Sequence, residues 1–382
     1  MTAGVLARQA PATSGLRPID PRRDMAQVAD LIEVAFRGDL DPMGRRMVRE
    51  MRAMGRAGWI GWALSSVLLP PAARPQGFVW EQDGRVVGNA GLVPVRGFPE
   101  RWVLANVAVS PEYRRRGIGR QMVEAAIDHA RQGGGESLYL QVGRDNGPAR
   151  YLYEALGFQT LTTRTSWRRH AGQPGEPVSP LVPPAPPVPP VPSAVEGSAV
   201  EGYIPPAPSL VEGRGAEGSA VEGSGAEGSP VEARVQIRPR QRGEWSRQWE
   251  LATQAFPDGL VWPYPLDPGF FRGARVSGQH DWLAWNGGRV IGSLTTRAAL
   301  RQAQGAVLRQ AQDAAVRMVV LAAPDAQGEI ERDLVAYGLI AMRRKKTTIV
   351  IDYLADVADQ ALKGLGFREE RTLAWMRREL KE

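Results

Sequence analysis

The sequence contains no cysteine, and this absence removes several classes of function. Without thiols there is no disulfide framework, no zinc knuckle and no cysteine nucleophile. Histidine is almost as scarce, because His129, His170 and His280 lie far apart and none has a partner at metal-ligand spacing. We therefore expect no metal site, and the composition fits neither a metal hydrolase nor a cysteine enzyme.

Long apolar runs are also missing. No stretch approaches the roughly 18 residues that a membrane helix needs, and the first residues lack the apolar segment of a secretory signal. We expect a cytoplasmic protein that makes no membrane contact. The net charge of +7 comes from arginines spread along the chain without a nucleic-acid motif, so nucleic acid is not an expected partner.

Composition divides the 382 residues into two folded halves and a spacer. Residues 183–190 are rich in proline, and the phrase Ser-Ala-Val-Glu-Gly then recurs from residue 193 onward. Such a segment has too little large apolar surface to fold. The prediction is a tail over 1–15, a domain over 16–170, a disordered linker over 171–233 and a second domain over 234–382. A Leu-Arg-Gln-Ala-Gln repeat at 300–312 is interpreted as an insertion in a hairpin loop, or as an exposed helical piece.

Hydrophobic periodicity in the first half predicts an α+β sheet with helices on both faces. Asp83-Gly84 is a hairpin signal between two strands. Strands are expected at 16–19, 77–81, 85–95, 102–109, 137–142 and 158–168, and helices at 24–36, 42–69, 117–132 and 147–156.

Residues 107–120 read Val-Ala-Val-Ser-Pro-Glu-Tyr-Arg-Arg-Arg-Gly-Ile-Gly-Arg and suggest an anion site. Pro111 stops an apolar strand, a basic turn follows, and Gly117 and Gly119 open an amphipathic helix. The first amides of a helix point outward, the helix dipole adds positive charge, and glycines let phosphate oxygens approach the backbone. This motif alone is also compatible with a plain glycine turn before a helix. Additional charge would come from Arg114, Arg115, Arg116 and Arg120.

A second motif, Asn-Gly-Pro-Ala-Arg-Tyr-Leu-Tyr-Glu-Ala-Leu-Gly-Phe, covers residues 146–158 and follows a strand at 138–142. The two motifs in this order resemble the GCN5-related N-acetyltransferase (GNAT) superfamily over residues 16–168, most specifically over 107–158. The resemblance implies a mixed, splayed β-sheet flanked by helices. It also implies acetyl-CoA as co-substrate, without a metal, and direct transfer of its acetyl group to a primary amine in a ternary complex.

The resemblance implies a role for each matching position. The backbone of Val107, Ala108 and Val109 would pair with the pantetheine arm, and residues 114–120, including Ile118, would hold the pyrophosphate. Asn146 and Tyr153 would then lie beside the pantetheine and the thioester. The Val109 N–H would act as an oxyanion-type donor.

The resemblance identifies a candidate for the catalytic acid but not for the catalytic base. Tyr153 is the expected acid for the leaving CoA sulfur, although a tyrosine on a helix can also be a packing residue. Asn146 orients the cofactor or caps the following helix. The amine must lose a proton, yet residues 104–109 contain no carboxylate. Glu100, Glu81, Asp145 and a water chain remain open as bases.

The second half repeats the pattern without its chemistry, which predicts two tandem copies of the fold joined by the Pro/Gly/Ser-rich linker. Leu362 stands where Tyr153 does and Ala355 where Asn146 does. Residues 327–332 align with 114–119 but lack both glycines, and Glu329 and Glu331 would repel a pyrophosphate. We expect this half not to bind CoA, and to shape a cleft for a small-molecule or peptide amine or to form a homodimer surface. The alternative for the whole chain is a non-catalytic acyl-CoA sensor.

Overall fold

The computed structural model describes residues 14–38, 40, 42–56, 76–95, 98–173, 175, 235–255, 260–261, 264–265, 268–272, 279–298, 315–342 and 347–381. Most of the predicted tail and linker, and the repeat at 300–312, lie outside these residues. None of the helices in these ranges is both long and apolar enough to cross a membrane.

The N-terminal half forms the strands and helices that its periodicity predicts. In chain order they are β1 (Gly15–Pro18), α1 (Met25–Ala35), α2 (Pro42–Arg56), β2 (Gln76–Gln82), β3 (Arg85–Val95), β4 (Phe98–Val109), η2 (Pro111–Tyr113), α4 (Ile118–Gln132), β5 (Ser137–Gly143), α5 (Gly147–Ala155) and β6 (Gln159–Arg169). The helix expected at 42–69 is described to Arg56, and residues 57–75 lie outside the described ranges.

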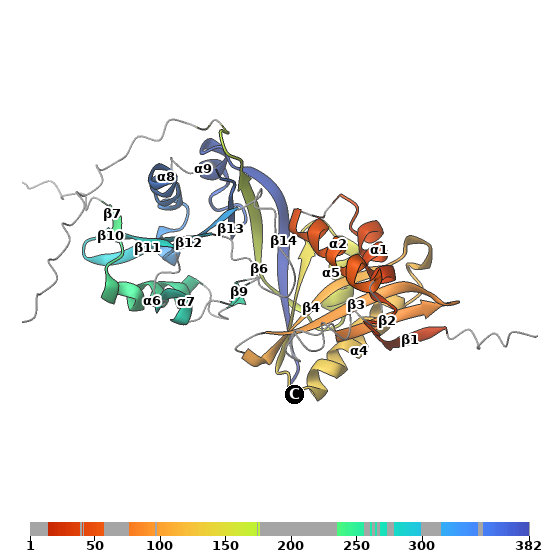
Figure 1. The fold of residues 1–382 in the computed structure, drawn as a ribbon. Coiled ribbons are helices and arrows are strands. Elements are labelled where there is room, and N and C mark those ends of the chain that lie inside the picture. Colours follow the sequence, from red (N-terminus) through yellow and green to blue (C-terminus); the bar gives the residue numbers. More distant parts are fainter. Residues whose placement is uncertain are drawn as a thin grey trace, which may run out of the picture.

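Helices cover both faces of this half of the sheet (Figure 1). The helix α4 buries Ile118, Met122 and Ala126 against one face, because apolar residues recur at spacings of three and four. On the opposite face, α1 buries Val28 and Ile32 against β2 and β3. The predicted α+β layering is confirmed.

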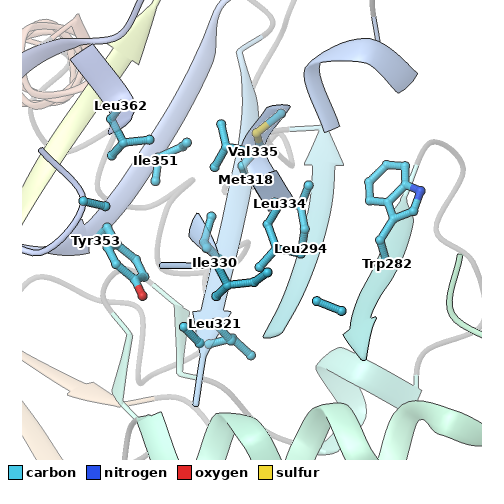
Figure 2. Packing of buried hydrophobic residues seen from close by; sticks show 14 of the residues in the cluster. Trp282, Leu294, Met318, Leu321, Ile330, Leu334, Val335, Ile351, Tyr353 and Leu362 are labelled. Atoms are coloured by element: carbon cyan, nitrogen blue, oxygen red, sulfur yellow. The ribbon is translucent and has the colours of Figure 1, made fainter. Parts of the chain in front are cut away.

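The C-terminal half repeats this order. Its elements are β7 (Gln236–Pro239), η3 (Arg242–Glu244), α6 (Trp245–Ala255), β8 (Leu260–Val261), β9 (Tyr264–Pro265), α7 (Pro268–Arg272), β10 (His280–Asn286), β11 (Arg289–Ala298), β12 (Val316–Ala322), η4 (Pro324–Ala326), α8 (Glu331–Ala341), β13 (Ile349–Leu354), α9 (Asp359–Gly364) and β14 (Arg368–Glu379). Its core packs α8 residues such as Leu334 against Leu294 and Met318 of the sheet (Figure 2).

The same backbone details occur in both halves. The β2–β3 turn uses positive φ at Asp83 and Gly84, and the β10–β11 turn does so at Gly287 and Gly288. The chain therefore contains two tandem copies of one fold.

The two copies exchange their last strands. The twelve strands of the sheet run in the order β1-β2-β3-β4-β5-β14-β6-β13-β12-β11-β10-β7. The C-terminal strand β14 thus lies between β5 and β6, and β6 of the first half pairs with β13 of the second (Figure 1). We expected 158–168 to complete its own half, but alternation along a strand specifies its faces and not its neighbours.

The exchanged strands contribute to each other's cores. Ala374 and Met376 of β14, and Leu380 directly after it, are buried in the core beneath α4. From β6, Trp167 is fully buried in the core of the C-terminal half. Each half is consequently completed by a strand from the other.

Candidate functional site

The strands β4 and β5 separate after a short paired segment. They are parallel and pair only over Arg101–Val103 and Ser137–Tyr139, whereas β4 continues to Val109 and β5 to Gly143. Beyond Val103, the backbone groups on this side of β4 have no strand partner among the described residues. We call this opening the β4–β5 gap.

The Val109 N–H faces the β4–β5 gap. The next residue, Ser110, donates its N–H to the Val87 carbonyl of β3 at 2.8 Å. Because consecutive residues of a strand direct their backbone groups to opposite sides, the N–H of Val109 points away from β3. The structure therefore orients the predicted oxyanion-type donor toward the opening.

The turn before α4 presents free amides at the same end of β4. Arg115 has a φ of 61° and Gly117 a φ of 79°, an alternation that gathers successive N–H groups into a concave anion site. The first helical bond runs from Gln121 N–H to the Gly117 carbonyl at 3.1 Å, so the amides of residues 115–120 have no helical partner, whereas the Arg114 N–H donates to the Pro111 carbonyl at 3.3 Å. We call residues 114–120 the phosphate cradle.

Gly119 joins the cradle to the other elements of the site. A Cβ placed on it would lie 3.5 Å from Leu152 of α5 and 3.8 Å from Val109 of β4, which are ordinary contacts. Protein packing therefore does not require glycine here. What the missing side chain preserves is room for a ligand against the backbone.

The cradle arginines differ in how firmly they are held. The Nε of Arg114 donates to the Val109 carbonyl at 3.0 Å, and an Arg116 nitrogen donates to the Glu112 carbonyl at 3.0 Å. Arg120 pairs with Glu124 at 3.4 Å, whereas Arg115 has no hydrogen bond or ion pair with other described residues. All four side chains are exposed, so their charge is available to an anion.

Tyr153 lies on α5 and is buried, with its ring edge-on to Phe158 at 5.8 Å between centroids. Its hydroxyl has no hydrogen-bond partner among the described residues. Burial raises the pKa of the Tyr153 phenol above its usual value near 10. The phenol thus keeps its proton at neutral pH and is available as a donor.

The raised pKa of Tyr153 predicts alkaline destabilisation. The unfolded chain releases this proton near pH 10 while the folded chain retains it, so the free energy of unfolding falls as pH rises above about 10. Each such group contributes at most about 1.4 kcal/mol per pH unit. Urea unfolding between pH 9 and 11 should show this decline, and Tyr153→Phe should reduce its slope. An unchanged slope in the variant would contradict the assignment.

Asn146 adopts one of its two predicted roles. It is the N-cap of α5, and its Oδ1 accepts the Ala149 N–H at 3.2 Å. A cofactor contact from the same side chain remains a prediction. The side chain of Ile118 is buried against the sheet, so the predicted pyrophosphate contact at this position would have to come from its backbone amide.

The structure disfavours two of the three carboxylates considered as the base. Glu81 is buried in an ion cluster with Arg17, whose Nε donates to it at 2.6 Å. Glu100 precedes the paired segment of β4, so it lies at the opposite end from the gap. Asp145 is exposed on the turn before α5, beside the predicted site, and stays open as a base, as does a water-mediated route.

His129 is held by aromatic packing on α4. His129 packs edge-on between Phe78 and Trp102, with centroid distances of 5.8 and 5.9 Å. Within the described ranges no cluster of histidine and carboxylate residues could hold a metal ion.

The corresponding turn of the C-terminal half holds its own carboxylate. Glu331 is buried, its two oxygens accept the Gly328 N–H at 3.0 and 2.9 Å, and the Tyr353 hydroxyl donates to it at 2.5 Å. Sequence reasoning anticipated repulsion by this residue but missed that its side chain folds back onto the turn. The non-binding of CoA by this half remains a prediction, now with a physical basis.

Comparison with known proteins bears on the N-terminal half. Residues 47–158 match the family model described as the acetyltransferase (GNAT) family. This part of the chain is a GNAT domain. It contains the phosphate cradle, the β4–β5 gap and Tyr153, and it is the region where both sequence motifs occur.

Two curated relatives and one solved structure resemble the chain. The [ribosomal protein bS18]-alanine N-acetyltransferase of Escherichia coli K12 is 42% identical over 64 residues, which are 17% of this chain and 43% of the relative. The N-alpha-acetyltransferase RimI of Mycobacterium tuberculosis is 37% identical over 90 residues, 23% of this chain and 55% of the relative. A GCN5-related N-acetyltransferase from Sphaerobacter thermophilus matches with a TM-score of 0.52 and 14% identity over 96% of both chains.

The matches differ in how much of the chain they cover. The chain spans about half of the length of the curated relatives, and those matches cover less than a quarter of this chain. The structural match covers both halves but, at 14% identity, shows the fold alone. The GNAT fold of the chain is therefore shown, and the match to the acetyltransferase (GNAT) family model is confined to residues 47–158.

Proposed function

We propose that the chain is an N-acetyltransferase that moves the acetyl group of acetyl-CoA directly to a primary amine, at one site in the N-terminal half. The observation that carries this proposal is the meeting of three groups at one opening. The unpaired edge of β4, the phosphate cradle and the Tyr153 helix converge around Gly119. We place the reaction in the cytoplasm.

The residues present fit acetyl-CoA. Its diphosphate matches the free amides and exposed arginines of residues 114–120. Its pantetheine amides match the unpaired backbone of Val107, because an extended chain can pair with an exposed strand edge. Val109 would contact the cofactor through its N–H, since its carbonyl accepts the Arg114 Nε at 3.0 Å. Ala108 directs its side chain into the core beneath α1 and its backbone groups toward Asn89 of β3, so the geometry does not favour the predicted cofactor contact at Ala108.

The chain's own groups can supply two of the three needs of acetyl transfer. The Val109 N–H, directed into the gap, would stabilise negative charge on the thioester oxygen. The Tyr153 phenol, protonated and without a partner in the described residues, would donate to the leaving sulfur. Asn146 would hold the start of α5, and with it Tyr153, in place.

The third need, a neutral amine, favours a particular acceptor. An alkyl amine with a pKa near 10.4 is neutral in only about one molecule in a few thousand at pH 7, whereas an α-amine with a pKa near 7.8 is neutral in roughly one in seven. Because Glu81 is held in an ion cluster and Glu100 lies at the far end of β4, an acceptor that needs little help from a base is favoured. The names of both curated relatives refer to amino-terminal or alanine acetylation, and we propose a peptide α-amine as the acceptor.

Release of free thiol from acetyl-CoA in the presence of amines tests this function. We expect turnover with peptides that carry a free N-terminus, and at pH 7 less with amines of pKa above 10. Tight acetyl-CoA binding without turnover across a broad panel would instead support the non-catalytic acyl-CoA sensor.

Removal of the Tyr153 hydroxyl should impair chemistry without unfolding the protein. In Tyr153→Phe we expect kcat to fall by about 10²- to 10⁴-fold, the range for loss of a general acid, while the acetyl-CoA Kd changes little. Stability at neutral pH should be nearly unchanged, because the hydroxyl has no partner in the described structure. Steady-state thiol release and thermal unfolding measure both effects.

Tyr151→Phe is the matched control, since Tyr151 lies two residues away and is 75% exposed. Its kcat should remain within about twofold of the wild type. Equal rates for the wild type and Tyr153→Phe would remove Tyr153 from the mechanism.

A further inference from the structure

A β-bulge in β4 precedes the residues that face the gap. Asn89 pairs with Ala108 and Gly91 pairs with Ala105, so two residues of β4, Asn106 and Val107, stand opposite Ala90. Asn106 has a φ of 53°, a left-handed conformation that asparagine tolerates better than most residues. The ladder on β3 is broken at this point.

The bulge reverses which way the end of β4 faces. Before it, the Glu100 carbonyl accepts the Glu136 N–H at 2.7 Å, so even-numbered residues direct their backbone groups toward β5. After it, the Ser110 N–H bonds to Val87 of β3, so the even-numbered residues point the other way. If the same residues of β4 continued as a regular strand without the bulge, the Val109 N–H would face β3 instead of the gap.

The side chains show the same reversal. Trp102 and Leu104 lie in the core beneath α4, whereas Val103 and Ala105 pack on the opposite face. Past the bulge, odd-numbered residues pack beneath α4 and Ala108 lies on the opposite face, beneath α1. Backbone and packing therefore agree on a one-residue change of phase.

One buried side chain holds the bulge. The Nδ2 of Asn89 donates to the Asn106 carbonyl at 2.8 Å, and Asn89 is 2% exposed. This bond gives a partner to a carbonyl that the bulge removes from the ladder, and a buried carbonyl without one would be costly.

The C-terminal half lacks this arrangement. Its β11–β12 ladder runs without a register shift from Gly292–Ala322 to Ala298–Val316. At the position of Asn89 it has Ser293, whose hydroxyl accepts the Gln248 amide at 2.6 Å. The bulge and its asparagine thus occur only in the half whose cradle glycines are intact.

We propose that Asn89 is a positioning residue for acetyl transfer: its side-chain amide locks the bulge at Asn106 and so keeps the Val109 N–H directed at the reacting carbonyl. The inference rests on the proposed function, because it assigns Val109 a role in the reaction. It predicts that Asn89 affects the chemical step more than the binding of CoA, whose diphosphate is held at the separate cradle.

The test replaces Asn89 with leucine, which has a similar shape but cannot donate. In Asn89→Leu we expect kcat for acetyl transfer to fall about 10- to 100-fold, an effect no larger than that of losing an oxyanion donor. The Kd for CoA should stay within about threefold of the wild-type value. Hydrogen exchange of the peptide spanning residues 103–110 should accelerate without ligand. Gln248→Met is the matched control, because it removes a buried amide from the C-terminal half.

The results separate the possible failures. Asn89 is only a packing residue if Asn89→Leu lowers stability as Gln248→Met does and changes neither kcat nor the hydrogen exchange of residues 103–110 more than Gln248→Met. That result would overturn the inference. If the wild type neither binds acetyl-CoA nor acetylates any amine, the proposed function fails. The exchange measurement then still decides whether Asn89 holds the bulge.

Discussion

A chain truncated after Phe367 should lose the cooperative fold of its N-terminal half, although the deletion lies entirely in the C-terminal half of the sequence. The truncation removes β14, and with it Ala374, Met376 and Leu380 from the core beneath α4. It also leaves β5 and β6 without their shared neighbour. Loss of one large buried side chain costs about 2–5 kcal/mol, and the whole domain is stable by only about 5–15 kcal/mol. Circular dichroism during urea unfolding should lose the part of the cooperative transition that comes from the N-terminal half, while the C-terminal core, which contains no residue of β14, keeps its own.

Cleavage of the peptide chain between the halves gives the matched control. A protease site introduced between Gly197 and Ser198 breaks the connection but leaves every strand pair intact. After cleavage the two fragments should elute together in size-exclusion chromatography and retain acetyl-CoA binding. A fragment ending at residue 175 that unfolds cooperatively and binds acetyl-CoA like the full chain would contradict the exchanged-strand arrangement.

Gly119→Asp should abolish acetyl-CoA binding while preserving the fold. A carboxylate at this position would face the diphosphate, and two such charges 4 Å apart repel by about 4 kcal/mol at the effective dielectric near a protein surface. We therefore expect at least a 100-fold increase in Kd. The added Cβ makes only ordinary contacts with Leu152 and Val109, and aspartate in the first turn of a helix is favourable. Calorimetric titration and thermal unfolding separate the two effects.

The control for Gly119→Asp uses the repeated fold. Arg332 stands at the corresponding position in the second turn, eight residues after Pro324 as Gly119 is after Pro111. Arg332→Asp should leave the acetyl-CoA affinity unchanged, because that turn already holds the Glu331 carboxylate. If both substitutions weakened acetyl-CoA binding equally, the cause would be a general charge effect rather than binding of the diphosphate at Gly119.

The sequence predicts local structure well where one segment contains all the information. The apolar spacing of α1 and α4, the turn at Asp83-Gly84 and the strand that stops at Pro111 each depend on nearby residues. The phosphate cradle is local too, since its glycines and arginines are consecutive. These features could be placed to within one or two residues of their observed bounds.

Features that depend on distant partners could not be derived in this way. The strand β14 carries the same alternating pattern whether it pairs with β5 or with β13, so the exchange is invisible in its sequence. The bulge depends on Asn89 and Asn106, which are 17 residues apart on different strands. Glu331 reads as a repelling charge, and only the fold brings Gly328 and Tyr353 to it.

The central claim is that a single acetyl-CoA is held by the N-terminal cradle. Calorimetric titration of the full chain with acetyl-CoA tests it most directly. The account predicts one binding site per chain, lost in Gly119→Asp and retained in Arg332→Asp. No binding by the wild type, or two sites per chain, would contradict it.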